Sequence, residues 1–264
     1  MRPPRAPEHA YFDGPPLALA HRGGAAYAPN RGIENSLRAF RTAVDLGYRY
    51  VETDVHATSD GQLVAFHDDR LERVTDGRGT LAELPWSVVR AARIDGREPI
   101  PLLSELLEEL PGTCINIDIK AAGAVEPLWE TIRAHRAQGR VCVASFSDRR
   151  LGAFRRLAGP SVATAAGPRE TAALRFGPAQ LSAGRHFPAR VLQIPVTHPL
   201  GPISVRLVSR GLLDRAHSLG KQVHVWTIDD PVEMRRLLDL GVDGLVSDRI
   251  DVLRDVLVAR GQWS

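Results

Sequence analysis

Short apolar runs alternate with helix-like segments along almost the whole chain. The runs are rich in Val, Ile and Leu, and the segments between them carry apolar residues at the three- and four-residue spacing of an amphipathic helix. The runs predict strands at Leu17–Ala20, Tyr50–Val55, Leu63–His67, Ile115–Lys120, Val141–Phe146, Ser161–Ala165, Val191–Val196, Val223–Ile228 and Gly244–Ser247. The segments predict helices at Glu34–Leu46, Pro101–Leu110, Val125–Ala137, Arg149–Ala158, Val205–Leu219, Pro231–Leu240 and Ile250–Ala259.

The repeated succession of strand and helix predicts an α/β fold with a parallel sheet covered by helices. The nine candidate strands fit a TIM (β/α)8-type barrel plus a β-hairpin arm at 63–67. An open doubly wound sheet is the alternative, but the strand number disfavours it and no Gly-x-Gly-x-x-Gly follows the first strand. Gly47, Gly220 and Gly241 each close a predicted helix shortly before a strand, where a left-handed residue is expected.

The most informative pattern lies in the second and third strands. Glu52 and Asp54 stand two residues apart in an apolar run, so both carboxylates project from one face of the strand. Such a pair repels itself unless a cation lies between its members, and oxygen ligands suit Mg²⁺ or Ca²⁺. Asp60 and Gly61 predict a hairpin turn. With these two residues as the turn centre, Asp54 faces His67 across the hairpin.

Polar residues of complementary kinds stand at the ends of two other strands. His21 and Arg22 follow the first strand, and Asn116, Asp118 and Lys120 alternate along a later one. The face with these three residues should point into the barrel, because an outward face meets helices and would be apolar. Carboxylates can hold a divalent ion, Arg and Lys suit a phosphate, and two histidines can divide acid and base work. The set predicts phosphodiester cleavage.

The chain is expected to form a single domain over residues 1–264, because one barrel of this type takes about 250 residues. Residues 69–101 interrupt the alternation with several glycines and prolines, and we expect a small insertion over the barrel mouth. Residues 1–14 carry three prolines and no apolar stretch typical of a signal peptide or membrane anchor. We therefore expect a flexible lead-in and a cytoplasmic protein.

Composition narrows the expected partners. The net charge of +3 is small and no arginine run is present, so nucleic-acid binding is not expected. No basic amphipathic helix argues for stable membrane insertion. Cys114 and Cys142 lack a Cys-x-x-Cys spacing and are expected to be buried free thiols of a reducing compartment. A small-molecule substrate fits this composition, and the sequence leaves the oligomeric state open.

Taken in order, the motifs resemble the glycerophosphodiester phosphodiesterases, a family of phosphatidylinositol phospholipase C-like TIM barrels. The resemblance covers about residues 17 to 258 and rests on the ordered set, since each motif alone is weak. The matching segments are Ala20-His21-Arg22-Gly23-Gly24, Glu34-Asn35-Ser36, Glu52-Thr53-Asp54-Val55, His67-Asp68, Asn116-Ile117-Asp118-Ile119-Lys120, Ser145-Phe146, Val225-Trp226-Thr227-Ile228, Gly241-Val242-Asp243-Gly244 and Ser247-Asp248.

The resemblance implies a TIM barrel with one divalent cation, Mg²⁺ or Ca²⁺. It also implies metal-dependent hydrolysis of glycerophosphodiesters to glycerol 3-phosphate and an alcohol, by two-histidine acid–base catalysis. The implied metal ligands are Glu52, Asp54 and Asp118. The implied catalytic histidines are His21 and His67. The residues implied to bind the phosphate are Arg22 and Lys120.

Three further residues have two interpretations each. Glu34 aligns with a family Glu and belongs either to the substrate site or only to the start of its helix. Trp226 either lines the glycerol site or packs in the barrel. His56 shares a face with the carboxylate pair, and we expect a strand-end histidine in preference to a metal ligand.

Two departures from the family pattern bear on the site. Asp118 stands where the family usually has Glu, so the ion must lie closer to that strand or a water must fill the gap. Related sphingomyelinase D-like barrels use an Asp there. The usual Pro-Glu-Asn-Thr after the first strand becomes the longer segment Pro29–Ser36, and the added Arg31 could alter the pocket mouth.

For the mechanism, we expect His21 to act as the base and His67 as the acid, although the sequence leaves the order open. A lysophospholipase D or a cyclic-phosphate-forming phosphodiesterase on the same barrel is the alternative. A non-catalytic phosphodiester-binding barrel is less favoured, because its usual signature is the loss of a histidine or a carboxylate ligand. Head-group specificity and the choice of metal stay open.

Overall fold

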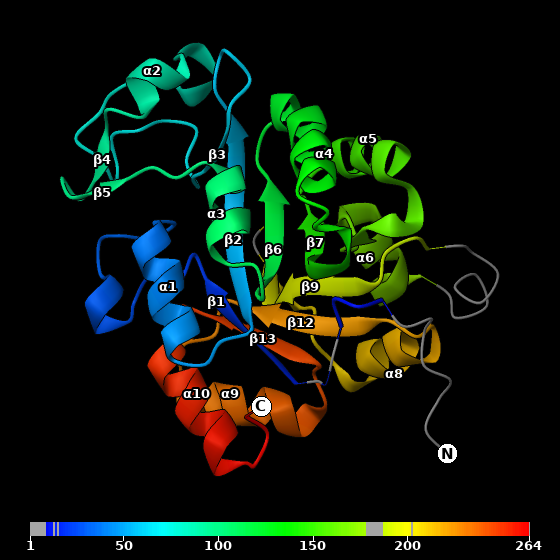
Figure 1. Ribbon diagram of the computed structural model, residues 1–264. Coiled ribbons are helices and arrows are strands. Elements are labelled where there is room, and N and C mark those ends of the chain that lie inside the picture. The colour runs from blue at the N-terminus through cyan, green and yellow to red at the C-terminus, as the bar shows by residue number, and fades with distance from the viewer. Residues whose placement is uncertain (1–8, 13, 15, 178–186, 202, 264) are drawn as a thin grey trace.

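Eight parallel strands form the wall of a barrel (Figure 1). In chain order they are β1 (Leu17–His21), β2 (Tyr50–Ala57), β6 (Cys114–Ile119), β7 (Val141–Ala144), β8 (Ala163–Thr164), β9 (Val191–Pro195), β12 (Gln222–Trp226) and β13 (Gly244–Ser247). Around the ring the order is β8-β7-β6-β2-β1-β13-β12-β9, and each neighbouring pair is parallel. A parallel bridge from Ala165 to Val191 brings the two ends together. The predicted TIM-type barrel is confirmed.

The computed structural model describes residues 9–12, 14, 16–177, 187–201 and 203–263. The expected lead-in at 1–14 lies mostly outside these residues. Its described part is packed, because Tyr11 is fully buried with its ring 5.4 Å from the ring of Tyr50. The Tyr50 hydroxyl also donates a 2.7 Å hydrogen bond to the Tyr11 carbonyl.

The interior of the barrel changes from apolar to polar along the strands. Leu17 and Leu19 of β1 and Tyr50 of β2 are buried in one apolar cluster. Because side chains two apart share a face, the same faces continue to His21 on β1 and to Glu52 on β2. The alternation that fills the amino-terminal half of the barrel with apolar side chains therefore places polar ones at its carboxyl end.

Helices cover the outside of the barrel (Figure 1). They are α1 (Leu37–Asp45), α3 (Leu103–Glu109), α4 (Val125–Ala134), α5 (Asp148–Ala158), α6 (Pro168–Phe176), α8 (Arg210–Ser218), α9 (Pro231–Leu240) and α10 (Ile250–Ala259). Asp230 caps α9 by accepting two backbone N–H groups at 2.8 and 2.9 Å. Gly47, Gly220 and Gly241 all adopt positive φ, at 93°, 68° and 100°, as their positions after helices predict.

The segment around residues 197–219 differs from the prediction. The expected helix starting at Val205 is wrong in its first part, where β10 (Thr197–Leu200) and β11 (Ile203–Arg206) form an antiparallel ribbon. Ser209 then caps α8 by accepting the Leu212 N–H at 3.3 Å. The α6 helix was not predicted, because it buries only Leu174 and so lacks a clear apolar stripe.

The register of the β2–β3 hairpin also differs by one residue. β3 (Leu63–Ala65) pairs antiparallel with β2, with Val55 opposite Ala65. Asp54 therefore lies opposite Phe66, whose N–H donates to the Asp54 carbonyl at 2.9 Å, and the predicted pairing of Asp54 with His67 is wrong. The cause is a three-residue loop in which Gly61 takes the left-handed conformation, with φ of 82°, in place of a two-residue turn.

Residues 69–101 contain a 3-10 turn (Leu81–Glu83), α2 (Trp86–Val89) and the short ribbon of β4 (Arg93–Ile94) and β5 (Glu98–Pro99). Figure 1 shows this segment beyond the hairpin of β2 and β3. It has its own apolar cluster, which also includes Ile33 and Ala39 from the chain after β1. The segment is thus packed against the loop that follows His21.

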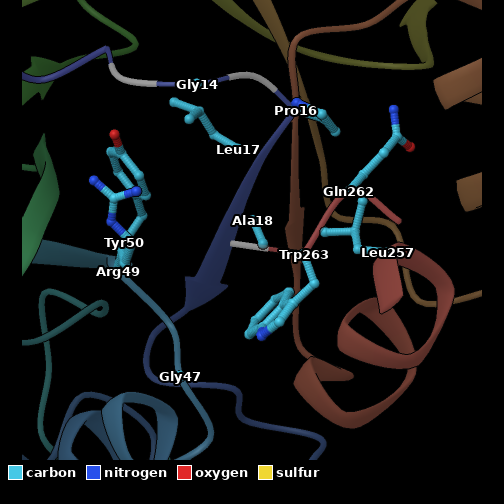
Figure 2. A pocket seen from close by; sticks show the side chains of 10 residues that line it. All are labelled: Gly14, Pro16, Leu17, Ala18, Gly47, Arg49, Tyr50, Leu257, Gln262 and Trp263. Carbon is cyan, nitrogen blue, oxygen red and sulfur yellow. The ribbon is translucent and has the colours of Figure 1, made fainter. Parts of the chain in front are cut away.

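The two ends of the barrel differ in the space that they enclose. At the amino-terminal end, Figure 2 shows Leu17, Tyr50 and Trp263 around a cavity of about 20 Å³, which holds no more than a water. At the carboxyl end, a cavity of about 470 Å³ opens, within the usual range for a small-molecule site. Among the described residues, no helix is long and apolar enough to cross a membrane.

Candidate active site

The large cavity gathers most of the residues singled out in the sequence. Eight of the nine predicted site residues line it: His21, Arg22, Glu52, Asp54, His67, Asp118, Lys120 and Trp226. The ninth, Glu34, is not among the lining residues, and it lies behind Arg22, with its Oε1 3.0 Å from Nη1. Glu34 also precedes α1, which starts at Leu37, so the interpretation of Glu34 as part of its helix is wrong.

Three carboxylates come from two adjacent strands. Asp54 on β2 and Asp118 on β6 are directly in register, and Glu52 lies two residues before Asp54. All three are at most 7% exposed. Burial, together with the charge of Asp54, raises the pKa of Glu52 to about 7. Burial likewise raises the pKa of Asp118, even though Lys120 lies beside it.

Two cations lie against these carboxylates. The Lys120 Nζ is 2.9 Å from Asp54 Oδ1 and 2.8 Å from Asp118 Oδ2, so its ammonium bridges the two strands. The Arg22 Nε is 3.2 Å from Asp54 Oδ2. Burial alone would raise the pKa of Asp54, but Lys120 and Arg22 lower it. Burial alone would lower the pKa of Lys120, but Asp118 and Asp54 raise it.

The donor set fits a hard divalent cation in its chemistry. Asp118 Oδ1 is buried and has no hydrogen-bond partner among the residues that the structure describes, which leaves one oxygen ready to take a ligand. Oxygen-only ligands are those that Mg²⁺ and Ca²⁺ prefer. As placed, however, no group of three or more His, Cys, Asp or Glu side chains in the described part of the chain is arranged to hold a metal ion. The Lys120 ammonium lies where Asp54 and Asp118 approach each other.

The His21 ring is oriented by a carboxylate from the last strand. Its Nδ1 lies 2.8 Å from Asp248 Oδ1, and its Nε2 lies 3.8 Å from Glu52 Oε2. Because an ionised carboxylate only accepts hydrogen bonds, Nδ1 carries the proton and Nε2 is the nitrogen available for proton transfer. Burial alone would lower the pKa of His21, but Glu52 and Asp248 raise it.

The His67 ring has the same arrangement with its neighbour Asp68. Its Nδ1 lies 2.6 Å from Asp68 Oδ1, which leaves Nε2 for reaction. Its backbone carbonyl is 3.1 Å from Nε2 of His56, a buried residue that is absent from the cavity lining. His56 therefore supports the strand end that carries His67, as expected for a strand-end histidine.

The turn after β1 places Arg22 over the carboxylates. Arg22 has a φ of 51°, which is uncommon for a residue with a side chain, and its N–H donates to Glu52 Oε2 at 3.2 Å. The next residue must be glycine, because a Cβ on Gly23 would lie 2.8 Å from the Cβ of Ala39. The His-Arg-Gly-Gly motif is thus a tight turn that packs under α1.

Several supporting residues were given no role in the site by reasoning from the sequence. Asp248 follows β13, whose Ser247 is in register with Ala20, so its place beside His21 follows once β1 and β13 are known to be neighbours. Asp229 Oδ1 accepts the Asp248 N–H at 2.9 Å and holds that loop. Asn35 donates to Asp54 Oδ2 at 3.3 Å.

Part of the cavity wall is apolar. Phe146 and Trp226 pack edge to face with ring centroids 5.5 Å apart. Phe176, Ile194 and Leu207 continue this wall. A phosphodiester in the cavity would therefore meet both charged groups and an apolar surface.

Comparisons with known proteins relate the whole chain to a family and to a fold. The model of the glycerophosphoryl diester phosphodiesterase family matches residues 21–252. A probable glycerophosphodiester phosphodiesterase 2 of Mycobacterium tuberculosis is 41% identical over 251 residues, covering 94% of this chain and 92% of the relative. A lysophospholipase D of Homo sapiens is 28% identical over 276 residues, covering 90% and 85%. The fold matches an Oleispira antarctica phosphodiesterase in complex with its product sn-glycerol-3-phosphate, with a TM-score of 0.77, 24% identity, and 92% and 97% covered.

Proposed function

This chain belongs to the glycerophosphoryl diester phosphodiesterase family and is a phosphoric diester hydrolase, and from that premise we propose that His21 and His67 cleave glycerophosphodiesters to glycerol 3-phosphate and an alcohol by acid–base catalysis. One observation carries the proposal. Two histidines, each with Nδ1 held by an aspartate, line the same cavity as the buried carboxylates and the two cations. The resemblance seen in the motifs is confirmed.

In the proposed reaction, His21 Nε2 takes a proton from water as the water oxygen attacks phosphorus. The bond from phosphorus to the alcohol oxygen breaks, and His67 delivers a proton to that oxygen. The raised pKa of His21, caused by Glu52 and Asp248 against the effect of burial, suits a base that must hold the proton it receives. Asp248 and Asp68 keep the two rings in the tautomer that this exchange needs.

Charge on the phosphate oxygens would be met by Arg22 and Lys120, which both line the cavity. Glu52, Asp54 and Asp118 are the residues that would hold a divalent cation. When bound there, Mg²⁺ or Ca²⁺ would stabilise the charge that grows on the phosphate oxygens in the transition state. The side chains of Arg22 and Lys120 would then change partners from carboxylate to phosphate.

The apolar wall favours a second candidate within the same chemistry, a lysophospholipase D. The human relative that bears this name matches 90% of the chain. Phe146, Phe176 and Leu207 offer the kind of surface on which an acyl chain could lie. In that case the substrate would be a lysophospholipid and the released alcohol a head group such as choline.

Product identification tests the proposal. Purified protein is incubated with glycerophosphocholine or with lysophosphatidylcholine, and the phosphorus NMR spectrum is followed. The proposed function predicts glycerol 3-phosphate from the first substrate. Formation of a cyclic phosphate in its place would show attack by the glycerol hydroxyl and contradict the role of water. Faster turnover of the lysophospholipid would favour the second candidate.

A further inference from the structure

Arg73, in the 69–101 segment, joins two carboxylates that each contact a residue of the cavity. Its guanidinium donates to both oxygens of Asp68, through Nε to Oδ2 and through Nη2 to Oδ1, the latter at 3.2 Å. It also donates to both oxygens of Glu34, from Nη2 to Oε1 at 2.7 Å and from Nη1 to Oε2 at 3.2 Å. One side chain thus makes four hydrogen bonds across two loops.

Each of these carboxylates also contacts a residue that lines the cavity. Asp68 Oδ1 also lies 2.6 Å from Nδ1 of His67. Glu34 Oε1 also accepts from Nη1 of Arg22 at 3.0 Å. The path His67–Asp68–Arg73–Glu34–Arg22 is therefore continuous, and Arg73 is its centre. Among the residues that the structure describes, no other side chain donates to both Asp68 and Glu34.

We propose that Arg73 is a positioning residue, which fixes the His67 ring through Asp68 and the Arg22 guanidinium through Glu34. The proposal rests on the function proposed above, since it assumes that His67 protonates the leaving oxygen and that Arg22 binds the phosphate. It gives the 69–101 segment a function, because the segment delivers the arginine that links the loop after β1 to the end of the β2–β3 hairpin.

The alternative is an ordinary surface ion pair, since the Arg73 side chain is 47% exposed. Isolated exposed ion pairs contribute little to stability, but bidentate arginine–carboxylate pairs within a network can contribute more. Here the side chains of Glu34 and Asp68 are only 16% and 21% exposed. Each carboxylate accepts hydrogen bonds from Arg73 through both of its oxygens. Leu71, two residues before Arg73, is buried in the apolar cluster of the segment and anchors the backbone there.

The shape of the guanidinium matters as much as its charge. Its planar fork presents donors in fixed directions, whereas a lysine ammonium is a point charge on a flexible stem. A lysine at this position could approach Asp68 or Glu34, but it would not reproduce four directed hydrogen bonds. Positioning by Arg73 therefore predicts that Arg73→Lys fails to restore activity.

The test compares Arg73→Gln with Arg70→Gln, a matched control from the same segment. Arg70 donates to Glu72 and to Thr80, and these three residues do not line the cavity. The control therefore removes the same charge and leaves the hydrogen bonds of Arg73 in place. The two variants and wild type are assayed on glycerophosphocholine and on a glycerophosphodiester of p-nitrophenol. The second leaving group departs as a stable anion and needs no proton from His67.

For Arg73→Gln, the expected result is a kcat on glycerophosphocholine lowered about 10–100-fold, the size of effect that small misplacement of catalytic groups produces. KM should rise as well, because Arg22 loses its support. On the p-nitrophenyl substrate the fall in kcat should be less than about 5-fold, and Arg70→Gln should lie within about 2-fold of wild type on both.

A folding defect is separated from a positioning defect by two further variants. Asp68→Asn disturbs only the connection from Arg73 to His67. It should reproduce the loss of kcat, with the same dependence on the leaving group. Glu34→Gln disturbs only the connection from Arg73 to Arg22 and should mainly raise KM. In the Asp68→Asn, Glu34→Gln background, adding Arg73→Gln should change kcat/KM by less than about 3-fold, because Arg73 then has nothing to position.

Equal losses on both substrates for Arg73→Gln, or full rescue by Arg73→Lys, would overturn the positioning role. So would an Arg73→Gln variant as active as Arg70→Gln. His67→Ala is measured alongside. If it loses activity while Arg73→Gln does not, this inference alone is wrong. If it keeps near-normal activity, the proposed division of acid–base work fails, and the inference fails with it.

Discussion

The Asp248 carboxylate, at the end of the last barrel strand, lies 2.8 Å from Nδ1 of His21, at the end of the first. The two residues are 227 positions apart in the chain and meet because β13 and β1 are neighbours in the barrel. The contact turns Nε2 of His21 toward Glu52 and the cavity. His67 and Asp68, which adjoin in the chain, repeat the relationship in the same cavity.

Asp248→Asn should lower kcat by about 100-fold or more, because an amide can donate to Nδ1 and favour the wrong tautomer of His21. The measurement is the steady-state hydrolysis of glycerophosphocholine. Asp243→Asn is the matched control, since Asp243 accepts a hydrogen bond from His217 at 2.7 Å outside the cavity. This control should lose stability but keep its kcat. Equal kcat for Asp248→Asn and wild type would contradict the orienting role.

The His217–Asp243 pair should make stability depend on pH. The hydrogen bond to Asp243 raises the pKa of His217 above its ordinary value of 6.5. A raised folded-state pKa contributes stability that is fully present below the unfolded pKa and is lost as pH rises through the folded pKa. His217→Gln should therefore cost on the order of 1 kcal/mol near pH 6 and much less near pH 9. Urea unfolding at both pH values measures this, and a difference that grows with pH would contradict it.

Gly23→Ala should destabilise the protein by about 2–4 kcal/mol and lower activity, because the new Cβ strikes Ala39 in a backbone conformation that alanine disfavours. Gly61 has a similar φ of 82°, but in the described part of the chain no atom lies within 4 Å of a Cβ added there. Gly61→Ala should cost only about 1 kcal/mol and spare kcat. Thermal unfolding and turnover are measured for both variants. Similar losses from the two would show that crowding under α1 is not what requires glycine at position 23.

Removal of divalent metal should abolish turnover if Glu52, Asp54 and Asp118 hold an ion. Dialysis against EDTA is expected to lower kcat by more than about 100-fold, with recovery on adding Mg²⁺ or Ca²⁺. Calorimetric titration of the stripped protein gives a readout without activity, and Asp118→Asn should weaken metal binding by about 10-fold or more. Full activity in EDTA, or unchanged metal affinity in Asp118→Asn, would contradict this assignment.

The barrel and most of the cavity could be predicted from the sequence because they follow from short-range patterns. Alternation along β2 and β6 places Glu52, Asp54 and Asp118 on interior faces. The strand-end position of His21 places it at the carboxyl rim. The α6 helix escaped prediction because it buries a single side chain and so shows little periodicity.

The partners of the histidines were harder to predict because they depend on the ring order and on loop geometry. Asp248 reaches His21 only through the neighbourhood of β13 and β1. Arg73 reaches Asp68 and Glu34 only through the packing of the 69–101 segment. The predicted register of the β2–β3 hairpin was wrong by one residue. The Asp-Gly sequence is compatible with both two- and three-residue loops, and only the backbone conformation of Gly61 decides between them.

The most direct test of the central claim is the kcat of His21→Ala and His67→Ala on glycerophosphocholine with added Mg²⁺ or Ca²⁺. His198→Ala is the matched control, because His198 lines the same cavity on the exposed β10–β11 ribbon and has no role in the proposed reaction. The account predicts a loss of about 10²–10⁴-fold for each of the first two variants and a value within about 3-fold of wild type for the control. Near-normal turnover in His21→Ala or His67→Ala would contradict it.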